Sequence, residues 1–274
     1  MNHSIAVFGC GTIGTEIARA VADGTIRSEL QCVYDRNPEK AERVRALFDE
    51  DDRPAAATEP SDLFAADIVV EAAGAGAVDA IAVDALSAGC DCMVLSAGAL
   101  ADATLRADVF EAAESGAGRL YVPSGAIAGL DAVKAAALTG ELESVSLTTT
   151  KPPAGLDGAP YIEREGIALD GIDAPTTVFE GSATEAAVGF PSNINVAMAL
   201  SLAGIGPEKT TVRIVADPDE ENNVHEIRAT GGMGTIETAV RNVPSPTNPK
   251  TSYLAAVSAI EKLRSLEASV GVGT

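Results

Sequence analysis

The pattern of apolar and polar residues along the chain changes in kind near position 123. Up to that point, short apolar runs alternate with longer stretches in which apolar residues recur every three or four positions. The runs predict strands at 4–8, 30–34, 68–71, 92–95 and 120–122, and the periodic stretches predict helices at 13–21, 38–48, 75–88 and 103–115. Strands that alternate with helices in this way predict a doubly wound parallel sheet, an architecture of the α/β class.

Beyond position 123 the predicted elements no longer alternate. Helices are predicted at 131–139, 182–188 and 193–203, the last capped by Ser192 or Asn193, and strands at 145–150, 210–216, 224–229 and 235–240. Strands that cluster after helices predict a second domain of the α+β class. The Pro-, Gly- and Asp-rich residues 151–177 are predicted to be loop with short strands, and the turn-rich residues 242–250 are predicted to be a linker.

An amphipathic helix is predicted at 252–266, where Leu254, Val257, Ile260 and Leu263 fall on one stripe. We expect this helix to pack back against the first domain. The predicted organisation is a first domain over residues 1–122, completed by residues 246–274, and a second, catalytic or substrate domain over residues 123–245.

A glycine motif, GxGxxG, stands between the first predicted strand and the first predicted helix. Gly9 allows a tight turn, Gly11 lets the backbone approach a pyrophosphate, and Gly14 lets the helix pack close to the strand. The N–H groups and the positive dipole end of the helix then hold phosphates. This context predicts a dinucleotide-binding Rossmann domain. The cofactor contacts predicted in the turn are Gly9, Gly11, Thr12, Ile13 and Gly14.

The next strand ends in Asp35, 21 residues after Gly14. An acidic residue there accepts hydrogen bonds from the ribose 2′-OH, which favours NAD, whereas the following Arg36 could bind the 2′-phosphate of NADP. The cofactor is therefore predicted to be NAD or NADP. Small-residue turns at 71–74 and 96–99 follow two further strands, and Ala73 and Gly74 are predicted to contact the cofactor there.

The charge balance is strongly acidic, with 40 acidic and 19 basic residues and a net charge of −21. Such a surface repels nucleic acid and anionic membranes, so neither is expected as a partner. Scarce lysine, frequent aspartate and abundant alanine favour a halophilic origin over ordinary acidic solubility. Because no apolar run is long enough to span a bilayer and no signal peptide precedes the first strand, we expect a soluble, cytoplasmic protein.

The four cysteines are Cys10, Cys32, Cys90 and Cys92, all on or beside predicted strands. The last two form CxC without a nearby histidine, so no metal site is expected. We predict that all four are buried, reduced thiols.

Of the two histidines, His225 lies in the second domain and His3 precedes the first strand. Hydride transfer needs a proton acceptor near neutral pH, which makes His225 the candidate catalytic residue, although a structural role is the alternative. Its titration is expected at about pH 6.5 before any effect of its surroundings. Lys151 and Lys250, both in predicted loops, are the next candidates.

The chain resembles the L-aspartate dehydrogenase family in seven segments spread nearly from end to end: VEAAGAGAV, LSAGAL, VPSGAIAGLDAV, TTTKPP, FPSNINVAMALSLAGIG, DPDEENNVHEI and NVPSPTNPKTSYLAAVSAI. The resemblance implies a Rossmann domain joined to a catalytic domain related to those of homoserine dehydrogenase and dihydrodipicolinate reductase. It implies oxidation of L-aspartate by NAD(P)+ to iminosuccinate, which hydrolyses to oxaloacetate and ammonia or enters NAD biosynthesis. His225 matches the family's catalytic histidine, and Ala126 and Asn195 match its cofactor-contact positions.

The substrate carboxylates need cationic or amide partners, and Asn248, Lys250 and Thr251 are the residues predicted to bind them. We expect a homo-oligomer, a homodimer in the simplest case. The rival enzymes are a homoserine dehydrogenase-like and a dihydrodipicolinate reductase-like oxidoreductase. The rival from another class is a non-catalytic dinucleotide-binding regulator.

The net charge of −21 generates a prediction about salt. Dissolved ions screen the mutual repulsion of the acidic side chains, so the melting temperature should rise with KCl well beyond physiological ionic strength. Thermal melts from low to molar KCl measure this directly. A melting temperature that stays flat over that range would contradict the halophilic interpretation.

Overall fold

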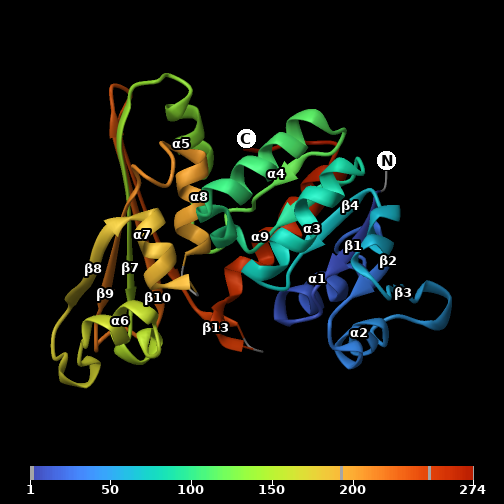
Figure 1. Cartoon of the computed structure of the whole chain (residues 1–274), viewed down its shortest axis with the longest axis horizontal. Coiled ribbons are helices and arrows are strands. Elements are labelled where there is room, and N and C mark those ends of the chain that lie inside the picture. The colour runs from blue at the N-terminus through green and yellow to red at the C-terminus, as the bar shows by residue number, and fades with distance from the viewer. Residues whose placement is uncertain (1–2, 192–193, 246–247, 274) are drawn as a thin grey trace. The chain divides into compact units, whose positions relative to one another are not determined.

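The computed structural model describes residues 3–191, 194–245 and 248–273, with side chains outside 244–251. The chain forms two compact units (Figure 1). The first unit comprises the chain up to Pro123 together with Ala256–Val272, and the second comprises Ser124–Ala255. Residues 248–255, which the sequence analysis grouped with the first domain, lie in the second unit.

The first unit contains a six-stranded parallel sheet in the order β3-β2-β1-β4-β5-β6. Its strands are β1 (Ser4–Phe8), β2 (Glu29–Tyr34), β3 (Ala55–Ala56), β4 (Ile68–Glu71), β5 (Asp91–Val94) and β6 (Leu120–Tyr121). Strands β2 and β3 follow one another on one side of β1, and β4, β5 and β6 follow one another on its other side. This order confirms the doubly wound parallel sheet, and it places the switch point between β1 and β4, where such sheets bind ligands.

The helices of the first unit are α1 (Thr12–Ala22), α2 (Pro38–Arg45), α3 (Ala75–Ser87), α4 (Ala103–Ser115) and α9 (Tyr253–Glu267). Three single-turn 3-10 segments, η1 (Glu50–Asp52), η2 (Pro60–Ala65) and η3 (Ala97–Ala101), complete it. As predicted, Asn37 caps α2, with its side chain 3.0 Å from the Glu39 N–H, and Pro38 takes the first position. The helix nevertheless ends at Arg45, three residues earlier than the predicted end.

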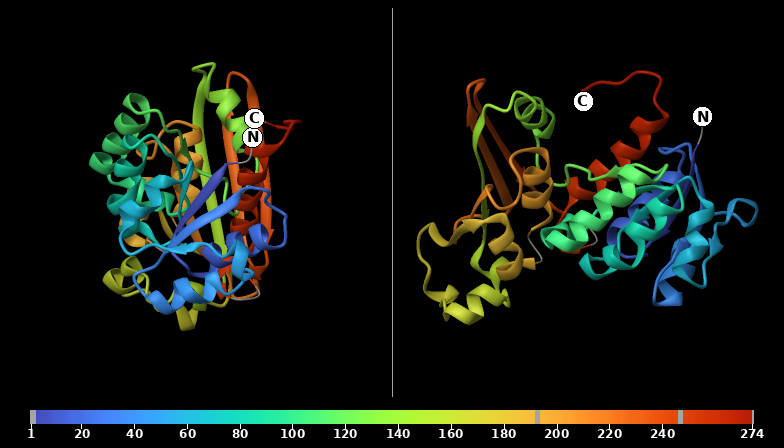
Figure 2. Two further views of the ribbon diagram at one scale, coloured as in Figure 1. Left: turned by 90° about the vertical axis from the view of Figure 1, so that its right-hand side faces the viewer. Right: turned by 45° about the horizontal axis from the view of Figure 1, so that its top comes forward.

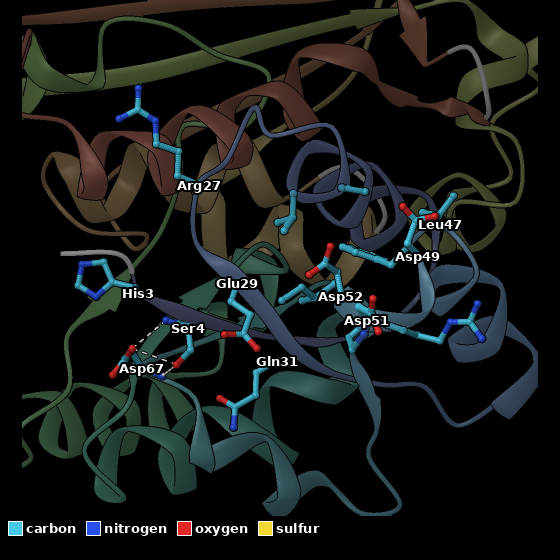
Figure 3. A pocket seen from close by; sticks show the side chains of 16 residues that line it. His3, Ser4, Arg27, Glu29, Gln31, Leu47, Asp49, Asp51, Asp52 and Asp67 are labelled. Carbon is cyan, nitrogen blue, oxygen red and sulfur yellow. Dashed lines mark hydrogen bonds between the residues drawn. The ribbon is translucent and has the colours of Figure 1, made fainter.

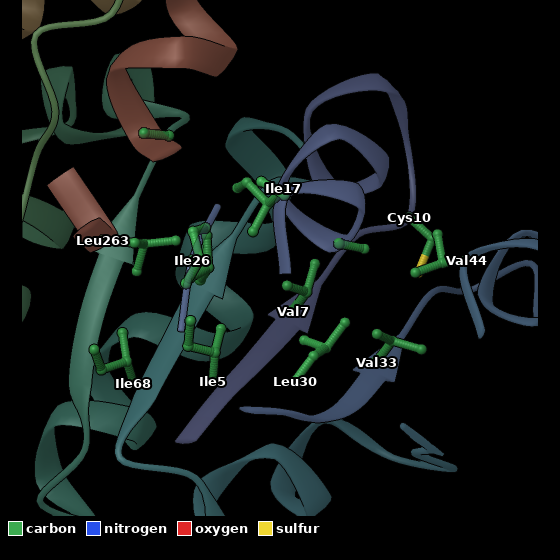
Figure 4. Close-up of a cluster of buried hydrophobic side chains, with 14 of the residues drawn as sticks. Ile5, Val7, Cys10, Ile17, Ile26, Leu30, Val33, Val44, Ile68 and Leu263 are labelled. Atoms are coloured by element: carbon green, nitrogen blue, oxygen red, sulfur yellow. The ribbon is translucent and has the colours of Figure 1, made fainter. Parts of the chain in front are cut away.

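Alternation along each strand separates the core into two layers, one on each face of the sheet. Ile5 and Val7 of β1 pack with α1, α2 and α9 on one face, and Figure 4 shows this layer close up. Ala6 and Phe8 pack with α3 and η2 on the other face. Helices therefore cover both faces, as the near-continuous apolar character of these strands requires.

Helix α9 turns to this core only the second half of the predicted stripe, Ile260 and Leu263. Ala256, Ala259 and Leu263 are its buried residues, whereas Leu254 and Val257 are each 37% exposed. Ile260 lies partly buried at the edge of the layer. In the first half of the helix, two alanines rather than Leu254 and Val257 are therefore the buried residues.

The second unit contains a five-stranded mixed sheet in the order β11-β10-β7-β9-β8. Its strands are β7 (Leu142–Lys151), β8 (Thr176–Ser182), β9 (Thr211–Ala216), β10 (Asn223–Gly231) and β11 (Gly234–Asn242). Only β7 and β9 run parallel. The helices α5 (Leu130–Ala137), α7 (Ala183–Gly189) and α8 (Asn195–Ala203) lie on one side of this sheet (Figures 1 and 2). This arrangement confirms the α+β second domain.

Two segments contain regular structure that was not predicted: residues 151–177, predicted to be loop with short strands, and residues 242–250, predicted to be a linker. Residues 151–177 contain η4 (Pro153–Leu156), the short helix α6 (Pro160–Glu165) and η5 (Leu169–Gly171). Tyr161 of α6 packs against Phe179 and Phe190, with ring centroids 5.0 and 5.5 Å away, so aromatic packing holds this helix in place. The predicted linker 242–250 contains two short paired strands, β12 (Pro244–Ser245) and β13 (Asn248–Ser252).

The helix predicted at 193–203 begins later than expected. Its first residue is Asn195, and Ile194 precedes it without a side-chain cap. The predicted caps, Ser192 and Asn193, lie outside the described residues. Across the described ranges, no helix combines the length and hydropathy needed to cross a membrane.

Candidate functional site

A cavity of about 400 Å³ opens at the carboxyl edge of the parallel sheet. It is bounded by the turns that follow β1, β2 and β4, which is where open α/β sheets bind ligands. Six of the residues predicted to bind the cofactor line it: Gly9, Gly11, Asp35, Arg36, Ala73 and Gly74. The sequence analysis missed Lys40 and Tyr34, which also line it.

The glycine turn gains its shape from close backbone contacts. Gly9 has φ +108°, donates its N–H to the Tyr34 carbonyl at 2.8 Å, and leaves no room for a side chain, because a Cβ would lie 2.6 Å from the Ala73 nitrogen. A Cβ on Gly14 would lie 2.0 Å from the Gly9 carbonyl oxygen. Gly9 therefore fits against the turn after β4, and Gly14 lets α1 pack on the glycine turn.

Gly11 differs from the other two glycines because a Cβ there would meet nothing within 4 Å. It precedes α1, and no side chain caps the N–H groups of the helix start. An open backbone position beside uncapped N–H groups and a positive helix end suits a pyrophosphate. The residues present thus fit a bound dinucleotide. Thr12, Ile13 and Gly14 are not among the residues that line the cavity, and Ile13 packs against the core instead.

Asp35 ties the glycine turn to the end of β2. One carboxylate oxygen accepts the Cys10 N–H at 2.8 Å and the other accepts the Asn37 N–H at 2.8 Å. A carboxylate has about four acceptor sites, so Asp35 retains capacity for ribose hydroxyls. Arg36 and Lys40 lie in the same cavity, and they bring positive charge to the place where a 2′-phosphate would bind.

Glu71, the last residue of β4, is a structural element of this cavity that the sequence analysis did not identify. It is 0% exposed, and its carboxylate accepts the N–H groups of Ala73, Gly74 and Ser96 at 2.8 to 3.0 Å and the Ser96 hydroxyl at 3.0 Å. These bonds hold the two turns after β4 and β5 in fixed positions. The signal in the sequence is an acidic residue that ends an otherwise apolar run, IVVE.

A second cavity of about 640 Å³ lies at the amino edge of the same sheet (Figure 3). Its lining includes Glu29, Asp49, Asp51, Asp52 and Asp67, and Asp67 accepts both the N–H and the hydroxyl of Ser4. This excess of carboxylates opposes binding of a phosphate-bearing cofactor. The carboxyl-edge cavity is therefore the candidate cofactor site.

The candidate catalytic residue lies in the second unit, on β10. His225 is 5% exposed and stands opposite Thr149 of β7, whose Oγ1 is 3.0 Å from the imidazole Nδ1. Thr149 therefore orients the imidazole ring through Nδ1, and it does not contact Nε2. Thr149 is the middle threonine of TTTKPP, and the sequence analysis did not single it out.

Lys151 is also part of this arrangement, and its predicted position in a loop was wrong. It is the last residue of β7 and is 8% exposed. Burial lowers the pKa of Lys151 to about 8. Burial, with the nearby charge of Lys151 as a smaller cause, lowers the pKa of His225 to about 4. His225 is consequently neutral at pH 7, and its titration falls well below the expected value of about 6.5.

The two predicted cofactor contacts in the second unit lie near the same sheet. Ala126 is buried, and its carbonyl accepts the Asn242 Nδ2 hydrogen at 2.9 Å, while Asn242 Oδ1 has no partner among the described residues. Asn195 is the first residue of α8. The backbone of Asn248, Lys250 and Thr251 forms part of β13, but their side chains lie outside the described ones.

All four cysteines are free and buried, as predicted. Burial raises the pKa values of Cys10 and Cys92 to about 12, so neither thiol is an activated nucleophile. Within the part of the chain that the structure describes, no group of three or more His, Cys, Asp or Glu side chains is placed to hold a metal ion.

Known proteins match the chain over both units. The family model "Aspartate dehydrogenase, C-terminal" matches residues 131–266, and "Homoserine dehydrogenase, NAD binding domain" matches residues 9–123. The chain is 48% identical to an L-aspartate dehydrogenase of Methanosarcina barkeri, over 98% of this chain and 99% of that protein. The chain belongs to the aspartate dehydrogenase family.

Other members and relatives agree with this assignment. An L-aspartate dehydrogenase of Nitrosopumilus maritimus is 44% identical over 95% of each chain. A crystal structure of aspartate dehydrogenase from Thermotoga maritima is similar over 100% of both chains, with 29% identity and a TM-score of 0.77. A homoserine dehydrogenase from Thiobacillus denitrificans shares the fold at 13% identity and a TM-score of 0.63, over 98% of this chain and 75% of that one. The cofactor of this aspartate dehydrogenase family member is NAD or NADP.

The two glycines of the turn allow a matched test of cofactor binding. Gly11→Ala should leave the melting temperature nearly unchanged, because the Cβ meets nothing, but should weaken NADH binding by about tenfold or more, because the methyl group stands where the phosphates approach. Gly14→Ala should instead lower the melting temperature, since its Cβ overlaps the Gly9 carbonyl. Calorimetric NADH binding and thermal melts on both variants give the comparison. Equal effects of the two substitutions on both measurements would contradict this geometry.

Asp35 generates a prediction about cofactor choice. Asp35→Ser should weaken NAD binding by about tenfold and favour NADP relative to NAD, because the carboxylate that binds ribose and repels a 2′-phosphate is lost. Asp102→Ser is the matched control, since Asp102 also accepts two backbone N–H groups but caps α4 and does not line the cavity. Both variants should melt earlier, and only Asp35→Ser should change the ratio of kcat/KM values for the two cofactors. An unchanged ratio would show that Asp35 does not contact the ribose.

Proposed function

We propose that this protein is an NAD(P)-dependent L-aspartate dehydrogenase, which oxidises L-aspartate to iminosuccinate. The observation that carries the proposal is the 48% identity with an L-aspartate dehydrogenase over 98% of the chain. Iminosuccinate then hydrolyses to oxaloacetate and ammonia. The reaction requires a hydride acceptor, a proton acceptor and a site for two carboxylates.

The hydride acceptor is the nicotinamide cofactor, which takes a hydride from the Cα of aspartate when it is bound. The residues proposed to hold it are those of the carboxyl-edge cavity. The N–H groups at the start of α1 bind the pyrophosphate, and Gly11 leaves room for it. Asp35 accepts from the ribose hydroxyls, and Ala126 and Asn195 of the second unit contact the cofactor as the family resemblance implies.

The proton acceptor is proposed to be His225. In the tautomer that carries its hydrogen on Nδ1, the imidazole would donate to the Thr149 hydroxyl and accept a proton at Nε2, so the ring would keep its orientation as its charge changes. Burial keeps the imidazole neutral at the start of the reaction. His225 either takes the proton that the substrate amine releases or activates the water that attacks the imine.

The two carboxylates of the substrate are proposed to meet cationic and amide side chains. Asn248, Lys250 and Thr251 remain the residues proposed for this role from the sequence. Their segment, β13, belongs to the same unit as His225.

An initial-rate panel tests the proposed function against its rivals. L-Aspartate with NAD or NADP should give rates at least about a hundredfold above those with L-homoserine, while dihydrodipicolinate with reduced cofactor should show no turnover. A preference for either rival substrate would overturn the proposal. Tight NADH binding without turnover of any substrate would favour a regulator.

Finer features of this enzyme are proposed from the sequence. They are a cytoplasmic location, a homodimeric assembly, a halophilic origin with a requirement for high salt, and a contribution of iminosuccinate to NAD biosynthesis. The net charge of −21 supports the salt requirement, because a protein so acidic is most stable where its charges are screened.

His225 generates the prediction that tests the catalytic assignment. His225→Ala should lower kcat for aspartate oxidation by about 10²–10⁴-fold, the usual effect of losing a general acid–base group. The Kd for NADH should change less than about threefold, because the proposed contacts lie mainly in the first unit. Measuring kcat and NADH binding on the same preparation gives both numbers. His3→Ala is the control, and it should leave both unchanged.

The pH dependence adds a second check on the same residue. Since the pKa of His225 is about 4 in the folded protein and about 6.5 when unfolded, the unfolded chain binds a proton first as the pH falls. Stability should therefore decline from about pH 6.5 to about pH 4, and His225→Ala should remove that part of the decline. Denaturant unfolding across this range measures it. A variant that stays folded and keeps most of its rate would show that His225 is a packing residue.

A further inference from the structure

One face of the five-stranded sheet is apolar along most of its length and polar at one end. On this face β7, β9 and β10 present mainly aliphatic residues: Val145, Leu147, Val212, Ile214, Ala216, Ile227 and Ala229. The polar residues are Thr149, Lys151 and His225, and they come together because His225 pairs with Thr149 and Lys151 lies two residues further along β7. Residues two apart on a strand share a face, so the Lys151 ammonium and the imidazole lie on the same side of the sheet.

Lys151 is the single Lys or Arg side chain among the described residues that is buried. Its methylene stem packs on η4, since a Cβ at Gly155 would lie 3.6 Å from the Lys151 Cβ. Burying an ammonium group in an apolar surrounding costs free energy, which the lowered pKa of Lys151 reflects. This free-energy cost indicates that Lys151 has a function that requires a buried ammonium group.

The carboxylates at the same end of the sheet lie in the loop between β9 and β10, at Asp217, Asp219, Glu220 and Glu221, and none of them is buried. The glutamates on the strands, Glu143, Glu180, Glu226 and Glu237, are all exposed. A chain with a net charge of −21 repels a dianion at long range, so a dicarboxylate requires local positive charge where it binds. Lys151 supplies such a charge next to the proposed proton acceptor.

We propose that Lys151 binds a carboxylate of the amino-acid substrate and so holds the substrate beside His225. The inference rests on the proposed function and adds a residue to it, because the sequence analysis assigned the carboxylates to Asn248, Lys250 and Thr251. An ammonium–carboxylate hydrogen bond formed out of water is strong and directional, and it positions the amine-bearing carbon near the imidazole. The same charge is a minor cause of the lowered pKa of His225, which keeps the imidazole unprotonated before the reaction.

The environment of Lys151 contains few other groups that could produce a pH effect. Helix α8, which packs on β7, carries no ionisable side chain. Asp131 and Lys134 of α5 and Glu185 of α7 are exposed. Asp157 after η4 and Glu221 before β10 are exposed. Asp217 and Glu220, in the loop between β9 and β10, are half-buried; the Asp217 carboxylate accepts the Asp219 N–H, and the Glu220 carboxylate accepts the Asn222 N–H and pairs with Arg241. Titration of Lys151 itself is therefore the expected source of a change in dicarboxylate binding near pH 8.

The test uses succinate, a dicarboxylate without an amine that the enzyme cannot oxidise. Its Kd is measured by calorimetry on the protein saturated with NADH, from about pH 6.5 to about pH 9.5, over which succinate stays a dianion. Binding to the unaltered protein should weaken as the pH rises through about 8, because Lys151 loses its charge. Lys151→Met should weaken binding about ten- to hundredfold at pH 7, the usual effect of losing a hydrogen bond to a charged group.

Lys151→Arg provides the decisive comparison, because a guanidinium keeps its charge over the whole range. This variant should bind succinate with a Kd that no longer rises above pH 8. Lys134→Met, at an exposed lysine of the same unit, is the matched control and should behave like the unaltered protein. Equal Kd values for Lys151→Met and the unaltered protein would overturn the proposal, as would a pH dependence that Lys151→Arg leaves in place. Thermal melts show whether Lys151→Met folds. If it does not, the pH dependence of succinate binding to Lys151→Arg tests the proposal.

A second measurement separates this proposal from the proposed function. Lys151→Met should raise KM for L-aspartate more than it lowers kcat, and it should leave the Kd for NADH unchanged. It should also shift the acid limb of the kcat/KM profile to higher pH, because His225 loses a nearby positive charge and its pKa rises. If the unaltered protein does not oxidise L-aspartate at all, the proposed function fails, while succinate binding still tests Lys151. If aspartate is oxidised and Lys151→Met changes neither KM nor succinate binding, only the role of Lys151 fails.

Discussion

The close approach of two backbone turns at the carboxyl edge of the parallel sheet is the constraint on which the cofactor site depends. Gly9 comes so near to Ala73 that no side chain fits between them. Two carboxylates fix these turns by accepting backbone N–H groups: Asp35 ties the glycine turn to the end of β2, and Glu71 ties the turn after β4 to the turn after β5. The cavity is therefore shaped by fixed backbone before any ligand binds, which lowers the entropic cost of binding one.

The second unit places ionisable groups in an apolar surrounding. A sheet face that is aliphatic over most of its length ends in Thr149, Lys151 and His225. Burial moves the pKa values of the lysine and the histidine downward, so that one titrates near pH 8 and the other stays neutral at pH 7. Pairs of groups whose surroundings separate their charge states in this way are typical of sites for proton transfer.

The alternation of strands and helices, the glycine turn and the resemblance to aspartate dehydrogenases were sufficient to predict the fold class and the family. Local pattern could not predict which residues tertiary contacts would bury. Lys151 looked like a loop residue because prolines follow it, yet its strand extends to that position. The pKa of His225 could not be predicted either, because it depends on β7 and β10 pairing across 76 residues of sequence. Similarly, α9 buries Leu263 as predicted, but Ala256 and Ala259 are buried in place of Leu254 and Val257.

The central claim is that this protein moves a hydride from the Cα of L-aspartate to a nicotinamide cofactor. The most direct test is a single turnover with L-aspartate deuterated at Cα, followed by mass spectrometry of the reduced cofactor. The account predicts one deuterium in each reduced cofactor and one equivalent of ammonia and oxaloacetate. Reduced cofactor without deuterium, or no reduction with aspartate in molar salt, would contradict it.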